Sequence, residues 1–490
     1  MTRHHASAAL VGAVLAATPA LANDEFFPTF GNTGYDVQSY DIALDVDPAK
    51  NTIAGVATLT VVAERQLGVF TLDLAGLTVS SVKVDGVAAK FSRDADKLKV
   101  ASPFPVRKGN TARVEVRYGG TPTPIQDPTA PGDPDYVLGW MHYKSAPYAL
   151  SEPVGASTFY PANDEPTDRA AFRFRITVDE PFTAVANGDL VDVIDRGARR
   201  TFVWSMPQPM TTWLATVHVN KFKLSTAMAG RRPVRVYATA ATKPADVKGY
   251  LKAAAMITWL EPLVGPYPYA SYGSVTVDDP ALYYALETQA MSTFPTGAAD
   301  ESIVVHELAH QWFGDSVSVQ EWRDLWLAEG FATYIETLWP NRNDPAAFDA
   351  AMAGLYDYAK QKALGPAVVD GPEEIFSNRT YVRGGLTLYA LRQKVGDKVF
   401  FQILKSWASW FRGQAVDTQD FIDTAVLVSG DQSVRPLLDA WLYQKPLPDF
   451  PAAASGAAPV AANAAAVANL VGLRCGLGRA HGSPAASCGN

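Results

Sequence analysis

Cysteine is almost absent from this chain of 490 residues. Its two cysteines, Cys475 and Cys488, both lie close to the end of the sequence. In an oxidising compartment they could close a short disulfide loop there. No further cysteine is present to complete a thiolate metal site or a redox motif. Cysteine chemistry is therefore not expected to carry the function.

Charged residues are also sparse, at 19% of the chain, and no basic stretch stands out among 42 basic and 50 acidic side chains. This balance argues against nucleic acid as a partner. The chain is 48% hydrophobic and 11% aromatic, which is ordinary globular composition and excludes collagen-like, disordered and coiled-coil proteins. The length suggests two or three domains.

Apolar runs long enough to span a bilayer are missing as well. Arg3 precedes an apolar run from Ala6 to Ala17, which is too short to cross a membrane. The small-x-small sequence Ala20-Leu21-Ala22 follows it and is typical of a cleavage site. We therefore predict that residues 1–22 are a secretory signal peptide, cleaved near Ala22. The mature chain is expected to be exported, to the periplasm or the exterior, without a membrane span.

Alternating apolar residues indicate strands in the first half of the mature chain, for example from Tyr40 to Val46. The dipeptides Asp85-Gly86 and Asn187-Gly188 are typical of hairpin turns between such runs. We predict a β-rich domain over residues 23–228.

Helical periodicity dominates after a break at residues 229–233, and we predict a mainly helical second domain with a small sheet over residues 229–450. Residues 451–490 hold long stretches rich in Ala and Gly with almost no charge, and are expected to form a loosely docked tail. The expected helices are Ala245–Leu263, Ser302–Phe313, Leu325–Leu338, Pro345–Leu364, Gly384–Val395 and Lys398–Trp410, with a strand near Tyr272–Val277.

Two of the few histidines lie four residues apart, in His306-Glu307-Leu308-Ala309-His310. Four residues make about one helical turn, so both imidazoles face the same side, as two zinc ligands from one helix would. Glu307 is placed to take a proton from a metal-bound water. The alternative is a helix that carries two unrelated polar histidines.

The third ligand is expected from the following helix, where Glu329 lies 18 residues beyond His310 in an apolar and aromatic run. An acidic group in such a run is costly unless it is paired or bound to metal. A solvated Glu329 is the poorer interpretation. Two histidines and one glutamate leave zinc an open position, which is typical of a catalytic site.

These residues resemble the zinc motif of the gluzincin metallopeptidases. The longer run from Val305 through Tyr334 is similar to the membrane alanyl-aminopeptidase family, which includes the leukotriene hydrolases. The resemblance covers about residues 36–450. It implies an α+β multidomain fold: a saddle-like N-terminal β domain, then a thermolysin-like, mainly helical zinc peptidase domain. Weaker matches are Tyr40-Asp41-Ile42, Phe159-Tyr160-Pro161, Asn163-Asp164-Glu165-Pro166 and Ala440-Trp441-Leu442.

The resemblance also implies residues that bind the substrate. Ala285-Leu286-Glu287-Thr288 takes the place of the family's GAMEN exopeptidase motif, so Ala285 would pair with the substrate backbone and Glu287 would hold its α-ammonium group. Tyr284 and Thr288 depart from that motif. Glu152 matches a second amine-binding position. The alternatives are a solvated acid at a strand end for Glu287 and an ordinary surface acid for Glu152.

Tyr381 begins Tyr-Val-Arg-Gly-Gly, which resembles the family's Tyr-x-Lys-Gly-Ala segment. The resemblance implies that its phenol stabilises the developing oxyanion. A plain core or surface tyrosine is the alternative.

Together these residues predict an exported aminopeptidase with one Zn²⁺ per chain and peptides with a free N-terminus as substrates. A hydrolase of another small substrate, such as an epoxide, is a second hypothesis, and a catalytically silent binding scaffold is a third. The large C-terminal helical domain of full-length relatives is not expected. The site should then be more open to solvent, or covered by a second copy in a homo-oligomer.

Overall fold

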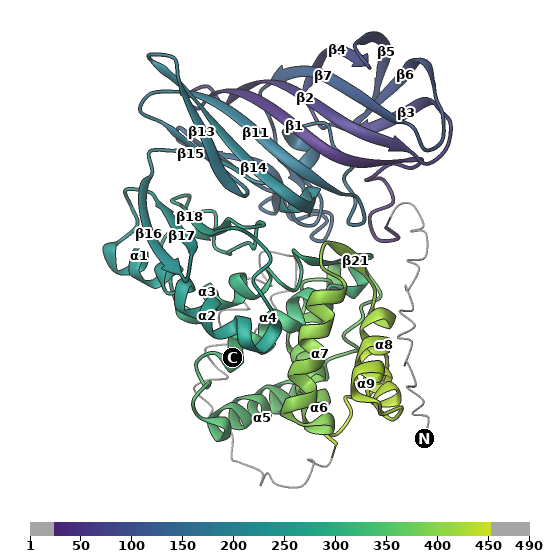
Figure 1. Ribbon diagram of the computed structural model, residues 1–490, viewed down its shortest axis with the longest axis vertical. Helices are drawn as coiled ribbons and strands as arrows, with labels where there is room; N and C mark the ends of the chain where they lie inside the picture. The colour runs from purple at the N-terminus through teal and green to yellow at the C-terminus, as the bar shows by residue number, and fades with distance from the viewer. Residues whose placement is uncertain (1–23, 452–490) are drawn as a thin grey trace, which may run out of the picture.

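The computed structural model describes residues 24–451, which form a β-rich part and a mainly helical part (Figure 1). The β-rich part stands above the helices in that view, and a smaller sheet lies at the left, between the β-rich part and the nearest helices. The predictions for the signal peptide (residues 1–22), for Cys475 and Cys488, and for nearly all of the tail lie outside the described residues.

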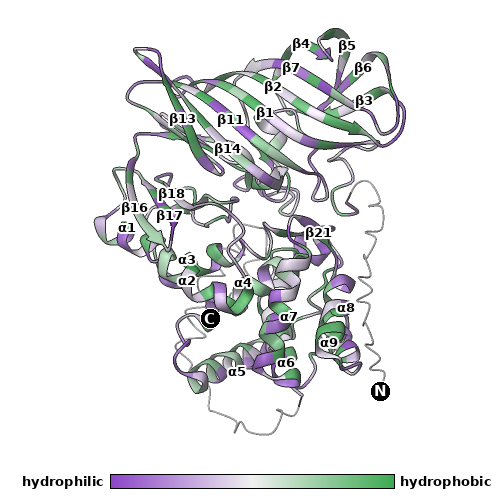
Figure 2. Cartoon of the chain, viewed as in Figure 1, coloured by the Kyte–Doolittle hydropathy of each residue, from purple (hydrophilic) through white to green (hydrophobic). Residues whose placement is uncertain are grey.

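The larger sheet contains ten strands: β1 (Tyr35–Asp47), β2 (Thr52–Ala63), β3 (Leu67–Asp73), β4 (Thr78–Val84), β5 (Val87–Asp94), β6 (Lys97–Val106), β7 (Thr111–Gly120), β11 (Arg169–Asp179), β13 (Asp189–Asp195) and β14 (Arg199–Thr211). Their order is β13-β14-β11-β1-β2-β7-β4-β5-β6-β3. Hydrophilic and hydrophobic residues alternate along many of these strands (Figure 2). The apolar side chains of β1 are buried, and the ring of Tyr40 stacks on that of Phe172 in β11 at 4.7 Å between centroids. The β-rich domain predicted from alternation is therefore present.

A second sheet has five strands: β8 (Ile125–Gln126), β9 (Val137–Tyr143), β10 (Ala146–Leu150), β12 (Thr183–Ala186) and β15 (Val217–Asn220). Tyr148 and Leu150 of β10 form an apolar cluster with Leu282 and Leu286 of the helical part. Their order is β12-β15-β10-β9-β8. Strand β10 runs directly into the segment that carries Glu152. This sheet therefore brings the β-rich part to the candidate site.

The two expected hairpin turns have different outcomes. Asp85-Gly86 joins β4 to β5, and both residues have positive φ, as a tight hairpin requires. The hairpin prediction for Asn187-Gly188 is wrong, because this dipeptide connects β12 of the five-stranded sheet to β13 of the ten-stranded sheet. The Asn187 amide donates to the carbonyl oxygens of Leu214 and Gln289 instead of closing a turn. Long-range hydrogen bonds therefore decide the path of the chain here.

The helical part contains a sheet of four strands in the order β16 (Lys223–Ala229), β17 (Arg232–Ala238), β18 (Tyr272–Val277) and β19 (Ser292–Pro295). Its helices are α1 (Pro244–Leu251), α2 (Ala253–Val264), α3 (Glu301–Ala309), α4 (Trp326–Leu338), α5 (Pro345–Gln361), α6 (Gly384–Val395), α7 (Asp397–Trp410), α8 (Thr418–Ser429) and α9 (Val434–Tyr443). Strand β16 precedes the boundary expected at residue 229, yet it pairs with β17 along its whole length. Backbone pairing thus extends the four-stranded sheet of the helical part back to Lys223.

Most expected helices are present with shifted ends. The single helix expected over Ala245–Leu263 is divided at Lys252 into α1 and α2. Helix α3 ends at Ala309, four residues earlier than expected, and Gly314 then adopts φ 125° in the following turn. Helix α8 and the short parallel pair β20 (Val317–Val319) and β21 (Gln414–Val416) were not anticipated. Within residues 24–451, no helix has both the length and the apolarity needed to cross a membrane.

Candidate active site

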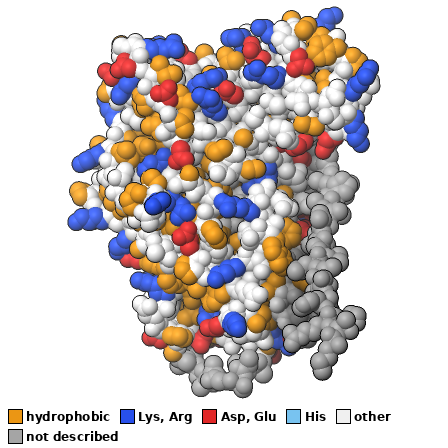
Figure 3. Space-filling model, in the orientation of Figure 1, with side chains coloured by type: hydrophobic (Ala, Val, Ile, Leu, Met, Phe, Trp, Pro, Cys, Tyr) orange, Lys and Arg blue, Asp and Glu red, His pale blue; other side chains and the backbone are white. Residues whose placement is uncertain are grey.

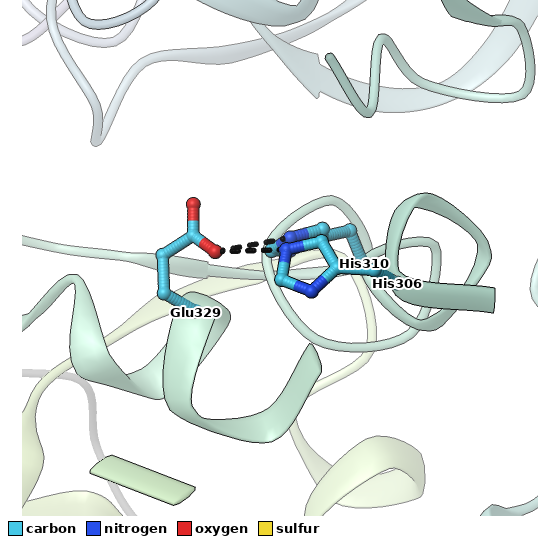
Figure 4. A group of neighbouring side chains, drawn as sticks. All are labelled: His306, His310 and Glu329. Atoms are coloured by element: carbon cyan, nitrogen blue, oxygen red, sulfur yellow. Dashed lines mark hydrogen bonds and ion pairs between the residues drawn. The ribbon is translucent and has the colours of Figure 1, made fainter. Parts of the chain in front are cut away.

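Helices α3 and α4 bring His306, His310 and Glu329 together (Figure 4). The side chain of Asp300 caps the start of α3 by accepting a hydrogen bond from the Ser302 amide at 2.9 Å. One turn separates the two histidines, so their imidazoles project to the same side, as their spacing predicted. Oε2 of Glu329 lies 3.2 Å from Nε2 of His306 and 3.3 Å from Nε2 of His310.

These separations fit a tetrahedral metal centre. Ligands about 2.0–2.1 Å from zinc lie about 3.3 Å from one another in a regular tetrahedron. The two nitrogen-to-oxygen distances match that edge length, and all three ligand atoms lie within 4.8 Å of one another. Two imidazoles and one carboxylate also form a donor set that zinc prefers and that leaves a coordination position open. The residues present therefore fit the metal expected from the sequence.

Close packing between two helices places Tyr381 beside Glu329. A Cβ atom added to Gly330 would lie 2.8 Å from the Gly384 backbone, so α4 and the start of α6 approach at a contact that only glycine permits. Tyr381 itself lies in a single π-helical turn, Arg379–Arg383, a local widening that is frequent at functional sites. Its hydroxyl donates to Oε1 of Glu329 at 3.0 Å.

A hydrogen bond at the Nδ1 atom of each imidazole orients both histidines. Nδ1 of His306 lies 3.0 Å from Oε2 of Glu336, and Nδ1 of His310 lies 3.1 Å from the carbonyl oxygen of Phe313. Such contacts fix the imidazole so that Nε2 is free for a metal. Sequence reasoning missed Glu336. It lies seven residues after Glu329 on the same face of an apolar helix, and the cost of burying an acid there could have identified it.

The carboxylates surrounding the histidines create a negative field that stabilises a cation. Burial alone would lower the pKa of His306, but its hydrogen bonds to the carboxylates of Glu329 and Glu336 raise it to about 9. Burial would raise the pKa of Glu329, yet the two histidines hold it well below its usual range. Both shifts show that positive charge between these side chains is favoured, whether a proton or a metal ion carries it.

The two histidines and Glu329 line a cavity together with Glu307. The same cavity is lined by Glu152, Ala285, Glu287 and Tyr381. Burial, helped by the charge of Glu287, raises the pKa of Glu307 to about 8. A carboxylate with a raised pKa is a stronger base than an exposed one and holds a transferred proton more readily. The structure thus places Glu307 where a general base would be needed.

Glu287 and Glu152 lie close together on one side of Glu329. Each of the three offers a carboxylate oxygen within 4.8 Å of the others. Burial raises the pKa of both Glu152 and Glu287, and the charges of neighbouring carboxylates add to both shifts. Oε1 of Glu152 and Oε1 of Glu287 are buried without a hydrogen-bond partner. Two such carboxylates are suited to an ammonium ligand, which would supply both charge and hydrogen bonds.

Gln311 connects the segment that carries Glu287 to the metal-binding helix. Its Nε2 donates to the carbonyl oxygen of Glu287 at 2.9 Å, and its Oε1 accepts from the Ala290 amide at 2.7 Å. Leu286 pairs with Thr293 in an antiparallel bridge that straightens the same segment. Sequence reasoning did not identify Gln311, although it directly follows His310.

The side chains at the candidate site are almost fully buried. The eight side chains expected at the site are each at most 8% exposed. The β-rich part contributes Glu152 to this pocket and stands above the helical part in Figure 1. The more open site expected from the sequence, or one covered by a second copy, stays a prediction. On the face shown in Figure 3, basic and acidic side chains are intermixed around scattered hydrophobic ones.

Comparison with known families agrees with this architecture. A model of the peptidase M1 N-terminal domain matches residues 37–214, and a model of the peptidase family M1 domain matches residues 270–441. Together the two matches span most of the described chain and meet at the candidate site. The chain belongs to peptidase family M1.

Solved M1 structures share both parts of this fold. The M1 zinc metallopeptidase from Deinococcus radiodurans superposes with a TM-score of 0.81 at 34% sequence identity, and the match covers 89% of this chain and 99% of that one. A mutant of that enzyme bound to a Tyr-Ser-Ala substrate gives a TM-score of 0.81, also at 34% identity, with 87% of this chain and 98% of that chain covered. Another structure of a mutant is described as a two-domain M1 zinc metallopeptidase.

Curated M1 relatives are longer than this chain. Leucine aminopeptidase 2 of Yarrowia lipolytica is 26% identical over 445 residues, covering 83% of this chain and 66% of its own length. Probable aminopeptidase 1 of Sulfurisphaera tokodaii is 23% identical, covering 85% of this chain and 53% of its own. The chain thus spans between about half and two thirds of these relatives.

Proposed function

We propose that this M1 chain is an aminopeptidase that holds one zinc ion and hydrolyses the first peptide bond of peptides with a free N-terminus. The observation that carries the proposal is the tetrahedral spacing of His306, His310 and Glu329 beside two buried carboxylates. Glu152 and Glu287 each have one buried oxygen without a hydrogen-bond partner, and that oxygen of Glu287 lies 3.8 Å from Nδ1 of His310. The first feature suits hydrolysis, and the second limits it to chain ends. The names of the curated relatives and the tripeptide bound by the Deinococcus enzyme point to the same substrate class.

Each side chain has a distinct part in the proposed reaction. A zinc ion held by the two histidines and Glu329 would supply Lewis-acid chemistry, by polarising a carbonyl and acidifying a water molecule. Glu307 accepts the proton of the attacking water and delivers it to the departing amine. The Tyr381 hydroxyl turns its one hydrogen from Glu329 to the carbonyl oxygen and donates a hydrogen bond as negative charge develops there. Its pKa is raised well above the usual range by burial and by Glu329, so it remains a neutral donor.

The substrate amine fixes which bond is cleaved. Glu287 and Glu152 bind the α-ammonium group, and the backbone at Ala285 pairs with the peptide. Glu152 and Glu287 each offer an oxygen within 4.8 Å of an oxygen of Glu329, a proposed zinc ligand, so an α-ammonium group bound there lies beside the metal site. The enzyme therefore releases single amino acids and does not cut within the chain.

Metal analysis together with product analysis tests this proposal. The purified protein is expected to contain one equivalent of zinc, to lose turnover on chelation, and to regain it when zinc is added back. Mass spectrometry of an unblocked peptide should show successive loss of single N-terminal residues. A protein that binds no zinc, or that hydrolyses only internal bonds, would contradict the proposal.

We also propose that the enzyme works outside the cytoplasm, on the strength of the signal-peptide pattern at residues 1–22. N-terminal sequencing of the exported fraction should find a mature chain that begins close to Asn23. Retention of Met1 in the active protein would contradict export by this route. The homo-oligomer expected from the sequence stays a prediction, which light scattering on the purified protein tests.

A further inference from the structure

A chain of hydrogen bonds runs beneath the segment that carries Glu287. The hydroxyl oxygens of Thr288 and Thr293 lie 3.1 Å apart, and that of Thr293 lies 3.1 Å from Nε2 of His218. The same Nε2 lies 2.8 Å from Oγ1 of Thr216, which donates to the carbonyl oxygen of Ala149 at 2.7 Å. Threonine and histidine side chains therefore connect two segments that lie more than one hundred residues apart.

The donor of each hydrogen bond follows from the single hydrogen that each threonine hydroxyl carries. Thr216 uses its one hydroxyl hydrogen on the Ala149 carbonyl, so it accepts from His218 Nε2–H. Thr288 donates to the Met291 carbonyl, so it accepts from Thr293. His218 is thereby the nitrogen donor at the centre of the chain, in the tautomer with its hydrogen on Nε2.

Both ends of this series of hydrogen bonds lie next to the proposed amine-binding carboxylates. Thr288 is adjacent to Glu287, and Ala149 lies on β10, three residues before Glu152. Thr288 is also a position where the sequence departs from the GAMEN motif, and the threonine hydroxyl allows the chain to form. The two carboxylates come from different domains, so their separation depends on contacts of this kind.

Asn187 provides a second connection between the same elements. Its Nδ2 donates to the carbonyl oxygen of Gln289 at 2.9 Å, and its Oδ1 accepts from the Thr216 amide at 2.7 Å. Thr216 thus contacts both Asn187 and His218. The five-stranded sheet, through its strand β15 and the residues that border it, holds the segment from Glu287 to Gln289 at two points.

We propose that His218 is a positioning residue that fixes the separation of Glu287 and Glu152, and so sets how strongly the enzyme prefers a protonated α-amine. This inference rests on the proposed aminopeptidase function. His218 is 1% exposed and touches no group of the proposed reaction directly. Burial lowers its pKa to about 3, so the imidazole stays a neutral donor near neutral pH.

The test compares two hydroxamates that differ only in the amine. Leucine hydroxamate and its analogue without the amino group both bind zinc through the hydroxamate. The dissociation constant of the analogue divided by that of leucine hydroxamate therefore reports only the amine pocket, formed by Glu287 and Glu152. Calorimetry on the zinc-loaded protein gives this ratio without any turnover. His218→Phe keeps an aromatic ring beside Tyr148 and removes the donor, whereas His218→Gln restores an N–H donor near the position of Nε2.

The matched control is His142→Phe. His142 lies on β9 of the same sheet, and its Nε2 lies 2.8 Å from the Pro48 carbonyl oxygen, away from the amine pocket. We expect His218→Phe to reduce the ratio by about 10- to 100-fold, the scale of a small misplacement of a binding group. His218→Gln should recover most of it, and His142→Phe should match the wild type. Zinc content should be unchanged in all three variants.

A wild-type ratio in His218→Phe would overturn the inference while leaving the proposed function intact. A wild-type protein that does not distinguish the two hydroxamates would contradict the proposed function itself, and this inference with it. Thr293→Val gives an independent test if His218→Phe does not fold. It removes the hydroxyl that contacts Nε2, and an unchanged ratio there would equally overturn the inference.

Discussion

Nδ1 of His306 lies 3.0 Å from Oε2 of Glu336, on the side of the imidazole opposite Glu329. His306 is therefore held between two carboxylates, both from helix α4. One carboxylate would share the metal with His306, and the other orients the ring. Helix α4 thus supplies one proposed zinc ligand, Glu329, and also Glu336, which orients a second proposed ligand, His306.

Glu336→Gln should weaken zinc binding by about 10- to 100-fold, because the neutral amide is a poorer acceptor and no longer raises the basicity of His306. Competition with a metal chelator measures this affinity. Asp349→Asn is the matched control, since it neutralises an acid on α5 that accepts a hydrogen bond from Tyr389. Equal zinc affinity in Glu336→Gln and the wild type would show that Glu336 does not support His306.

Tyr381→Phe should lower kcat by about 10²- to 10³-fold and leave KM within a few-fold, because the hydroxyl acts mainly on charge that develops in the transition state. Steady-state kinetics on an aminoacyl-fluorophore give both constants. Removing the hydrogen bond to Glu329 should not release the metal, because all three ligands remain. A variant that loses zinc, or one with an unchanged kcat, would contradict this role.

Glu287→Gln keeps the shape of the side chain but removes its charge. It should weaken binding of the substrate amine by about 2–5 kcal/mol, as expected when one partner of a buried charge pair is lost. Zinc content should be unchanged, since Glu287 is not among the three ligands. The measurement is kcat/KM together with metal analysis, and wild-type efficiency or loss of zinc would show that the assignment is wrong.

His218 should also leave a signature in acid stability. Its pKa is about 3 in the folded protein and near 6.5 when exposed, so below pH 6.5 the unfolded chain binds a proton that the folded chain excludes. The free energy of unfolding should therefore fall by about 1.4 kcal/mol per pH unit between pH 6.5 and pH 3 from this group alone. The stability difference between the wild type and His218→Gln should shrink as the pH falls from 7 to 5. Denaturant titrations measure it, and a constant difference would contradict burial of a neutral imidazole.

Local periodicity explains which parts of the site were predictable. The spacing of His306 and His310 encodes one helical turn, so the sequence alone placed both imidazoles on one side of α3. Glu329 was predictable because an acid in an apolar helix needs a partner. The same cost of burial applies to Glu336, which lies in the same apolar helix.

The remaining parts depend on contacts between distant segments. Asn187-Gly188 has the composition of a hairpin turn, yet the chain passes there from one sheet to another. The Asn187 side-chain amide donates a hydrogen bond to the carbonyl oxygen of Gln289, 102 residues away. His218 and Gln311 have no local pattern that distinguishes them from ordinary core residues. Their roles become visible only when β15 and α3 pack around the segment at Glu287.

In the proposed reaction, a free α-amine directs hydrolysis to the first peptide bond. The most direct test compares kcat/KM of the zinc-loaded protein for one peptide with a free N-terminus and for the same peptide after N-acetylation, with Glu307→Ala as the inactive reference. We expect release of the first residue from the free peptide and a rate at least about 10²-fold lower for the acetylated one, because two buried carboxylates would then lack their cation. Equal rates for the two peptides would contradict it.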